Sequence, residues 1–279
     1  MQIIVAERAG FCFGVKRAID IAFKLANKKE RGVYSLGPLI HNPQVIEKLK
    51  TEGVIPIDDV HFPDIKTLII RTHGISPEVN KEVSGKSYKI VDATCPFVKK
   101  AQKYVQILRE EGYQVLILGD RQHPEVQALL GFAGDNVIVV NSNEAIPPLK
   151  GRVGIIVQTT QPFEAFKTVV CQVIDYVKEI KVYNTICEST ALRLEETKKL
   201  AKMADLMIVV GGKNSANTTQ ITVLSKSICD KVYHIETADE LQDEWLKGVE
   251  NVGVTGGAST PQWIIDDVVE KLKEISCKR

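Results

Sequence analysis

The segment YKIVDATCPFVKKAQKYVQIL, residues 88–108, changes from the apolar pattern of a β-strand to that of an α-helix at Cys95. Two other segments change in the same way at Cys12 and Cys187: QIIVAERAGFCFGVKRAIDIAF (residues 2–23) and IKVYNTICESTALRLEETKKL (residues 180–200). The β-branched run in each segment predicts a strand, and the apolar spacing after the cysteine predicts a helix. The cysteines recur 83 and 92 residues apart, which predicts a threefold internal repeat.

The repeat extends beyond the cysteines. A second strand in each unit ends in a polar loop, and matching positions 29, 28 and 28 residues past the cysteine hold His41, His123 and Ser215. A third strand ends in a loop that carries His73, Thr159 with Thr160, or Ser259. Alternating strands and helices predict parallel sheets, whose carboxyl-end loops form the ligand site. We therefore expect nine such loops to face one cavity.

Prolines support these helix assignments. They stand near the first turn of five expected helices, at Pro43, Pro77, Pro124, Pro162 and Pro261. Proline is favoured there because the first helical N–H groups have no partner within the helix.

Composition sets broad limits on function. With 279 residues, 44% of them apolar, the chain is long enough to bury a full core as one large domain or as two or three small ones. Lysine and arginine total 36 against 35 acids, so a net charge of +1 gives no general attraction to nucleic acid or to an anionic membrane. No secretory leader or bilayer-length apolar run is evident, and we expect a cytoplasmic protein.

The six cysteines fall into two groups. Cytosolic thiols are normally reduced, and no two of these cysteines lie closer than 16 residues, so a metal would need distant segments to converge. We interpret three as buried, chemically inert side chains: Cys171, Cys229 and Cys277. The repeated three, Cys12, Cys95 and Cys187, are candidate ligands of one centre. Their spacing leaves open zinc with a histidine as fourth ligand, or an iron–sulfur cluster with one open iron.

Polar loop residues predict a site for an anion. The candidates lie at predicted strand ends, partly at helix N-termini: His41, His73, His123, Thr159, Ser215, Asn217 and Ser259. Such donors bind phosphate oxygens. Each hydroxyl or amide taken alone is better explained as a helix cap, and it is the threefold registration that favours an anion site. His61 and His234 read as ordinary surface or core residues. No P-loop and no dinucleotide fingerprint are present, so neither ATP nor NAD is supported.

Glu125 is the carboxylate that stands in one of these loops beside a histidine, in HPEV. In a closed cavity its pKa would rise, which suits a proton donor. The alternative is a surface residue that complements the helix dipole.

Nine ordered motifs together resemble the hydroxymethylbutenyl diphosphate reductase family, also called IspH or LytB, from end to end: AGFCFGVKRAI, LGPLIHNP, RTHGI, DATCP, HPEV, QTT, NTIC, GGKNSANT and GAST. The resemblance implies three pseudo-symmetric α/β domains with mostly parallel sheets, in a trefoil around a central [4Fe-4S] cluster. It implies three thiolate ligands, Cys12, Cys95 and Cys187, and one iron without a protein ligand.

The family reaction adds two electrons and two protons to 4-hydroxy-3-methylbut-2-enyl diphosphate and releases water, giving isopentenyl and dimethylallyl diphosphates. This is the last step of the non-mevalonate isoprenoid pathway. The resemblance implies that the diphosphate is bound by His41, His73, His123, Ser215, Asn217 and Ser259. Glu125 would deliver protons, and Thr159 and His123 would complete the relay. Ala216 stands where many relatives have a second serine, so a contact there would use the backbone N–H.

The family pattern also implies domain limits and a partner. Each cysteine-bearing strand completes the preceding sheet, giving domains 13–95, 96–187, and 188–279 together with 1–12. A ferredoxin or a flavodoxin would supply the electrons. Two other readings stay open: an iron–sulfur dehydratase that needs no net electrons, and a zinc-stabilised anion-binding protein.

Overall fold

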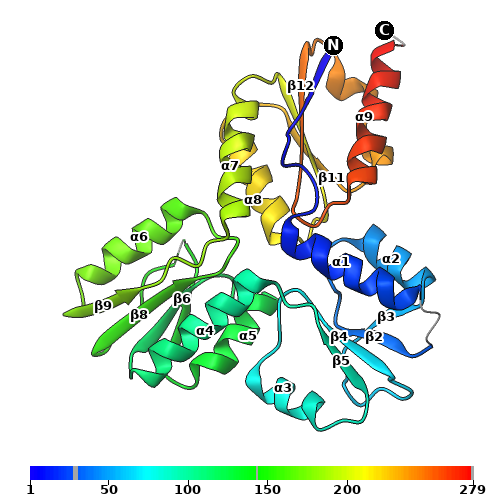
Figure 1. Ribbon diagram of the computed structural model, residues 1–279. Helices are drawn as coiled ribbons and strands as arrows, with labels where there is room; N and C mark the ends of the chain where they lie inside the picture. Colours follow the sequence, from blue (N-terminus) through cyan, green and yellow to red (C-terminus); the bar gives the residue numbers. More distant parts are fainter. Residues whose placement is uncertain (28–30, 143, 278–279) are drawn as a thin grey trace. The chain divides into compact units, whose positions relative to one another are not determined.

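The computed structural model describes residues 1–27, 31–142 and 144–277 (Figure 1). By its internal contacts the chain forms two compact units. The first comprises Met1–Lys16, Ile40–Glu47 and Glu188–Arg279, and the second comprises Arg17–Leu39 and Lys48–Cys187.

The second unit holds two four-stranded sheets. One has the order β3 (Val54–Ile57), β2 (Val33–Leu36), β4 (Thr67–Ile70), β5 (Lys89–Asp92). The other has the order β7 (Val137–Val140), β6 (Gln114–Leu118), β8 (Arg152–Val157), β9 (Glu179–Val182). The helices along this part of the chain are α1 (Phe13–Ala26), α2 (Pro43–Thr51), α3 (Pro77–Ser84), α4 (Pro96–Glu110), α5 (Pro124–Ala133) and α6 (Phe163–Ile174).

The first unit holds the third sheet. Its order is β1 (Gln2–Val5), β12 (Asn251–Gly256), β10 (Leu206–Val210), β11 (Val232–Ile235). Its helices are α7 (Glu188–Ala201), α8 (Ala216–Lys226) and α9 (Gln262–Cys277), with short 3₁₀ turns at Ala238–Glu240 and Asp243–Leu246. The first strand of the chain therefore pairs with its last.

The three sheets share one topology. Every strand pair is parallel, and in each sheet the strand that leads to a cysteine lies at one edge. Its neighbour is always the third strand of the repeat, namely β12, β4 or β8. The predicted α/β fold with a threefold repeat is confirmed. The division into three domains at the limits given above stays a prediction.

Helices cover both faces of the sheet formed by β7, β6, β8 and β9 (Figure 1), and the alternation of side chains along its strands explains why. Val115 and Ile117 of β6 pack with α4 and α5, whereas Leu116 and Leu118 pack with α6. Successive strand side chains point to opposite faces, so a continuous apolar run is what a doubly covered strand needs. This sandwich fixes the strand ends, where the loops begin.

The predicted helix starts are accurate. A helix begins one residue after each repeated cysteine, at Phe13, Pro96 and Glu188. Proline opens α2, α3 and α5, and it directly precedes α6 and α9. The sequence analysis did not single out β3, β7 and β11, which form the opposite edge of each sheet.

No helix in the described ranges is both long and apolar enough to cross a bilayer. One interpretation of the cysteines needs correction. Cys229 is buried as expected, but Cys171 and Cys277 are exposed. Both lie on helices, α6 and α9, which turn part of their surface to solvent, so apolar neighbours in the sequence do not ensure burial.

Candidate functional site

The backbone at each repeated cysteine is anchored in the same way. The N–H of Cys12 donates to Ala258 O at 3.1 Å, that of Cys95 to Thr72 O at 3.0 Å, and that of Cys187 to Thr159 O at 2.9 Å. In each case the acceptor belongs to the loop that follows the neighbouring strand. Each thiol therefore lies beside a loop that carries a predicted site residue.

The three repeated cysteines share the same local setting. Cys12, Cys95 and Cys187 are half-buried, and none of them forms a disulfide. Each directly precedes a helix, where the unpaired N–H groups and the positive end of the helix dipole stabilise a thiolate. Thiolates are the ligands that zinc and iron–sulfur clusters take in proteins. The gathering of all three around one centre stays a prediction.

In the second unit, Glu125 and Thr159 form a closed pair. The N–H of Thr159 donates to Glu125 Oε1 at 2.7 Å, and Thr159 Oγ1 donates to Glu125 Oε2 at 2.7 Å. Glu125 is only 2% exposed. Burial raises the pKa of Glu125 above its ordinary value, and the two hydrogen bonds from Thr159 oppose this rise because they stabilise the carboxylate. Burial prevails, so the site favours a neutral carboxylic acid.

His123 lies next to this pair and caps α5. Its Nδ1 accepts a hydrogen bond from the N–H of Glu125 at 3.2 Å. In a neutral ring the other nitrogen then carries the proton, so Nε2 is a donor. The His73 ring meets the His123 ring edge to face, with centroids 5.2 Å apart. Four predicted residues of this unit, His73, His123, Glu125 and Thr159, therefore form one cluster of linked contacts.

In the first unit, a second cluster brings together the remaining polar candidates. Ser259 Oγ donates to His41 O at 3.1 Å and lies 3.4 Å from Ser215 Oγ. Asn217 Oδ1 accepts the N–H of Ala258 at 2.9 Å. These contacts involve all four predicted polar residues of the unit.

Two features of this second cluster suit a ligand rich in acceptor atoms. Asn217 is 4% exposed, and its Nδ2 has no hydrogen-bond partner within the described residues. Ser215 caps α8, which begins at Ala216, so the first N–H groups of this helix face outward from its N-terminus. An unsatisfied buried donor is costly unless a ligand accepts from it. Ala216 itself offers only its backbone N–H.

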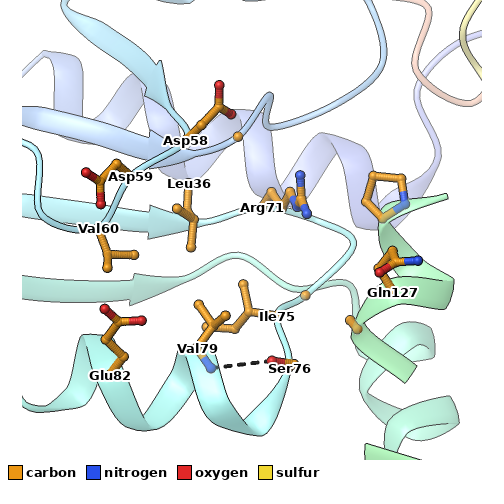
Figure 2. A pocket seen from close by; sticks show the side chains of 14 residues that line it. Leu36, Asp58, Asp59, Val60, Arg71, Ile75, Ser76, Val79, Glu82 and Gln127 are labelled. Carbon is orange, nitrogen blue, oxygen red and sulfur yellow. Dashed lines mark hydrogen bonds between the residues drawn. The ribbon is translucent and has the colours of Figure 1, made fainter. Parts of the chain in front are cut away.

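A cavity of about 460 Å³ is lined in part by the loop between β4 and α3 (Figure 2). Its lining includes Arg71 and Gly74, on either side of His73, and Pro124, between His123 and Glu125. The predicted site residues do not line it. Acidic side chains from the loop after β3 and from α3 face the cavity, and Ser76 Oγ on its wall accepts the N–H of Val79 at 3.4 Å. The cavity therefore adjoins these loops but does not contain the predicted site residues.

Sequence reasoning missed a buried cation. Arg193 on α7 is 3% exposed, and its guanidinium donates to backbone carbonyls of the loop before Cys12. The stretch ALRLEETKK around it resembles a charged surface helix, and no pattern in the sequence separates Arg193 from its exposed neighbours.

These features define a class: an α/β protein of three parallel sheets, whose strand-end loops carry thiols, a buried carboxyl group with a raised pKa, and hydrogen-bond donors. The LytB protein family model matches residues 3–273, and the chain belongs to this family. A Pelobacter propionicus protein named 4-hydroxy-3-methylbut-2-enyl diphosphate reductase is 49% identical over 280 residues and covers 100% of both chains. An Aquifex aeolicus protein of the same name is 48% identical, covering 99% of this chain and 97% of that one.

Two solved structures share the fold. One is described as (E)-4-hydroxy-3-methyl-but-2-enyl diphosphate reductase, the terminal enzyme of the non-mevalonate pathway. It is 48% identical with a TM-score of 0.74, covering 98% of this chain and 100% of that chain. The other is the corresponding reductase from Plasmodium falciparum, 28% identical with a TM-score of 0.90, covering 98% and 88%.

Proposed function

We propose that this chain is a 4-hydroxy-3-methylbut-2-enyl diphosphate reductase. The observation that carries the proposal is the end-to-end match to the family and to curated reductases at nearly half identity. The reaction breaks the C–O bond of the allylic alcohol, consumes two electrons and two protons, and releases water with isopentenyl or dimethylallyl diphosphate. Hydroxide is a poor leaving group, so a proton must reach the oxygen as the bond breaks.

Cys12, Cys95 and Cys187 would hold one [4Fe-4S] cluster with one iron open. Three cysteines outside any disulfide, each directly before a helix and each with its backbone N–H bonded to a site loop, support this assignment. When bound, the cluster supplies the electrons and a Lewis-acidic iron for the hydroxyl oxygen. Iron thiolates need reduced cysteines, which agrees with a cytoplasmic location. A ferredoxin or a flavodoxin would renew the electrons.

The chain's own polar residues would bind and orient the diphosphate. Donors that suit its oxygens are the imidazoles of His41, His73 and His123, the hydroxyls of Ser215 and Ser259, and the amide of Asn217. The buried Nδ2 of Asn217 supports this role because it has no partner within the described residues. Ala216 would contribute its backbone N–H at the start of α8, where anions are favoured.

Glu125 would hold the proton that the leaving hydroxyl needs. Burial raises the pKa of its carboxyl, which favours the protonated acid, and Thr159 contacts both oxygens. A hydroxyl both donates and accepts. In the neutral acid the carboxyl O–H would donate to Thr159 Oγ1, and the Thr159 hydroxyl would donate its own hydrogen to the leaving oxygen, which passes a proton onward from the carboxyl. His123 would take part through Nε2, because its Nδ1 accepts the N–H of Glu125.

Anaerobic purification with iron, sulfide and zinc analysis tests this function, followed by electron paramagnetic resonance of the reduced protein. We expect about four iron and four sulfide per chain, as the proposed cluster requires. The substrate should be converted only when a reductant is present. Product formed without electrons would favour the dehydratase, and a colourless protein containing zinc would favour the anion-binding alternative.

A further inference from the structure

Each helix that follows a repeated cysteine contacts the chain leading into another repeated cysteine. On α1, after Cys12, the guanidinium of Arg17 donates to two carbonyls. Nη1 reaches Thr94 O at 3.2 Å and Nη2 reaches Asp92 O at 3.3 Å. Cys95 is the next residue after Thr94. These bonds lie within the second unit and hold the last part of the lead-in to Cys95.

On α7, after Cys187, Arg193 does the same for Cys12. Its Nη2 donates to Gly10 O at 2.9 Å, and its Nη1 donates to Arg8 O and, at 2.8 Å, to Gly256 O. Gly10 lies two residues before Cys12 and has φ of 105°, a conformation that other residues rarely adopt. The buried guanidinium therefore holds the irregular turn that contains Arg8 and Gly10, and all of these residues belong to the first unit.

On α4, after Cys95, an aromatic contact takes the equivalent place. The ring of Tyr104 stacks on that of Tyr183, with centroids 4.1 Å apart and planes 8° apart. Tyr183 follows β9 and lies four residues before Cys187. The three contacts thus follow one rule along the chain: the helix after one cysteine holds the approach to the next.

Arginine suits this role because its planar guanidinium presents several donors in a fixed arrangement. The carbonyls that it binds lie at or just beyond strand ends, where the regular ladder stops, so they need other donors. A buried cation is tolerated only with such partners, and Arg193 is almost fully buried. Removing the guanidinium leaves these carbonyls without donors and frees the turn.

We propose that Arg17 and Arg193 are positioning residues that set the thiols of Cys95 and Cys12, respectively. Neither touches the reacting atoms. The inference builds on the proposed ligand role of these cysteines, but its consequence for thiol reactivity can be measured without any cluster. Failure of one proposal is therefore distinguishable from failure of the other.

The test compares Arg17→Met and Arg193→Met with control variants on the same helices. Methionine keeps an unbranched side chain that replaces most of the arginine stem, but it is shorter and removes the donors. Lys24→Met on α1 and Lys199→Met on α7 are the controls, since both lysines are exposed and Lys199 pairs only locally with Glu195. Arg193→Lys is added because it keeps the buried cation but removes the planar guanidinium. If Arg193→Met does not fold, this variant still measures the effect of losing the guanidinium.

The first readout is site-resolved alkylation of the full-length, cluster-free chain by iodoacetamide, with each cysteine quantified by mass spectrometry. Loss of Arg193 should change the rate at Cys12 by about 10-fold and leave Cys95 within about twofold, and loss of Arg17 should do the reverse, by analogy with outer-shell ligands of metal sites. The exposed Cys171 is the internal reference. Equal changes at both cysteines, or none at either, overturn the proposal.

The second readout is iron release from the anaerobic holoprotein to a chelator, followed by the loss of visible absorbance. Both methionine variants should release iron about 10-fold faster than wild type, and both control variants at the wild-type rate. Arg193→Lys should fall between them. If the lysine controls lose iron as fast as the arginine variants, helix stability explains the effect and the positioning role is wrong.

Discussion

Both carboxylate oxygens of Glu125 accept hydrogen bonds from one residue, Thr159, through its N–H and its hydroxyl. The pKa of Glu125 is therefore set by two opposing effects, its burial and its hydrogen bonds to Thr159. Burial favours the neutral acid, while the bonds from Thr159 favour the charged form. Burial is the larger effect, so the pKa of Glu125 lies above its ordinary value.

Replacing Glu125 by glutamine should remove turnover and keep the fold. The amide fills the same space but carries no transferable proton. We expect activity to fall by about 100-fold or more, the usual contribution of a positioned acid. Iron content and substrate binding should be unchanged. Steady-state assays beside iron analysis check this, and a variant with normal turnover would exclude the proton-donor role.

The stability of the wild-type protein should depend on pH through Glu125. Because the pKa in the folded state is raised, its contribution is fully present below the unfolded-state pKa and is lost as the pH rises through the folded-state pKa. Glu125→Gln cannot titrate there. We expect the unfolding free energy of wild type to fall relative to that of the variant across this window. Denaturant titrations at several pH values measure the difference, and parallel curves would contradict a buried neutral acid.

The hydroxyl of Thr159 should tune the pH dependence of activity. Thr159→Val keeps the shape and the backbone N–H but removes one bond that stabilises the carboxylate. The pKa of Glu125 should rise further, moving the alkaline limb of the rate profile to higher pH while lowering the maximal rate. Thr159→Ser should restore the wild-type limb. A limb that stays fixed in Thr159→Val means that another group limits the rate at high pH.

Cysteine substitutions should divide into two groups by iron content. Serine at Cys12, Cys95 or Cys187 removes a proposed ligand and should abolish most of the bound iron and the visible absorbance. Serine at Cys171 or Cys277 should leave both unchanged, because these exposed thiols lie on α6 and α9. Metal analysis of anaerobically prepared variants provides the test. Full iron in any variant of the first group would remove that residue from the ligand set.

The loop that carries Ser259 has no room for one more methyl group. A Cβ at Gly257 would overlap Oγ1 of Thr218, which is fully buried. We expect Gly257→Ala to lower the unfolding free energy by about 1–3 kcal/mol and to raise KM, because the loop must shift. Gly85→Ala is the control, since a Cβ there would lie 3.5 Å from Glu82 O, an ordinary contact. Equal stability of the two variants would contradict this crowding.

Local signals made much of the fold predictable. The switch in apolar period places the helix starts at Phe13, Pro96 and Glu188, one residue after each cysteine. Proline at the first turn fixes others. The outer strands β3, β7 and β11 were not predicted, because no repeated cysteine or polar site loop marks them, and β3 also contains Pro56. Such edges have weak apolar alternation, so their pairing is decided by the sheet and not by local pattern.

The candidate site was predictable where repeats align. Registration with the cysteines pointed to His41, His123 and Ser215, and the clusters around Glu125 and Ser259 agree with that selection. Arg193 was not predictable, because its burial results from the packing of α7 against the loop before Cys12. Exposure of Cys171 likewise depends on which side of α6 faces the sheet, which an apolar stretch does not specify.

The pairing of β1 with β12 sets an order of events at the ribosome. Residues 2–5 leave the ribosome before Asn251–Val254, with which they pair and which appear almost 250 residues later. At about 5–20 residues per second the delay is on the order of ten seconds or more. Until those residues appear, β1 has no partner in β12, and until Arg193 appears the turn before Cys12 lacks the donors of its guanidinium. The backbone around Cys12 therefore completes its hydrogen bonding late in synthesis.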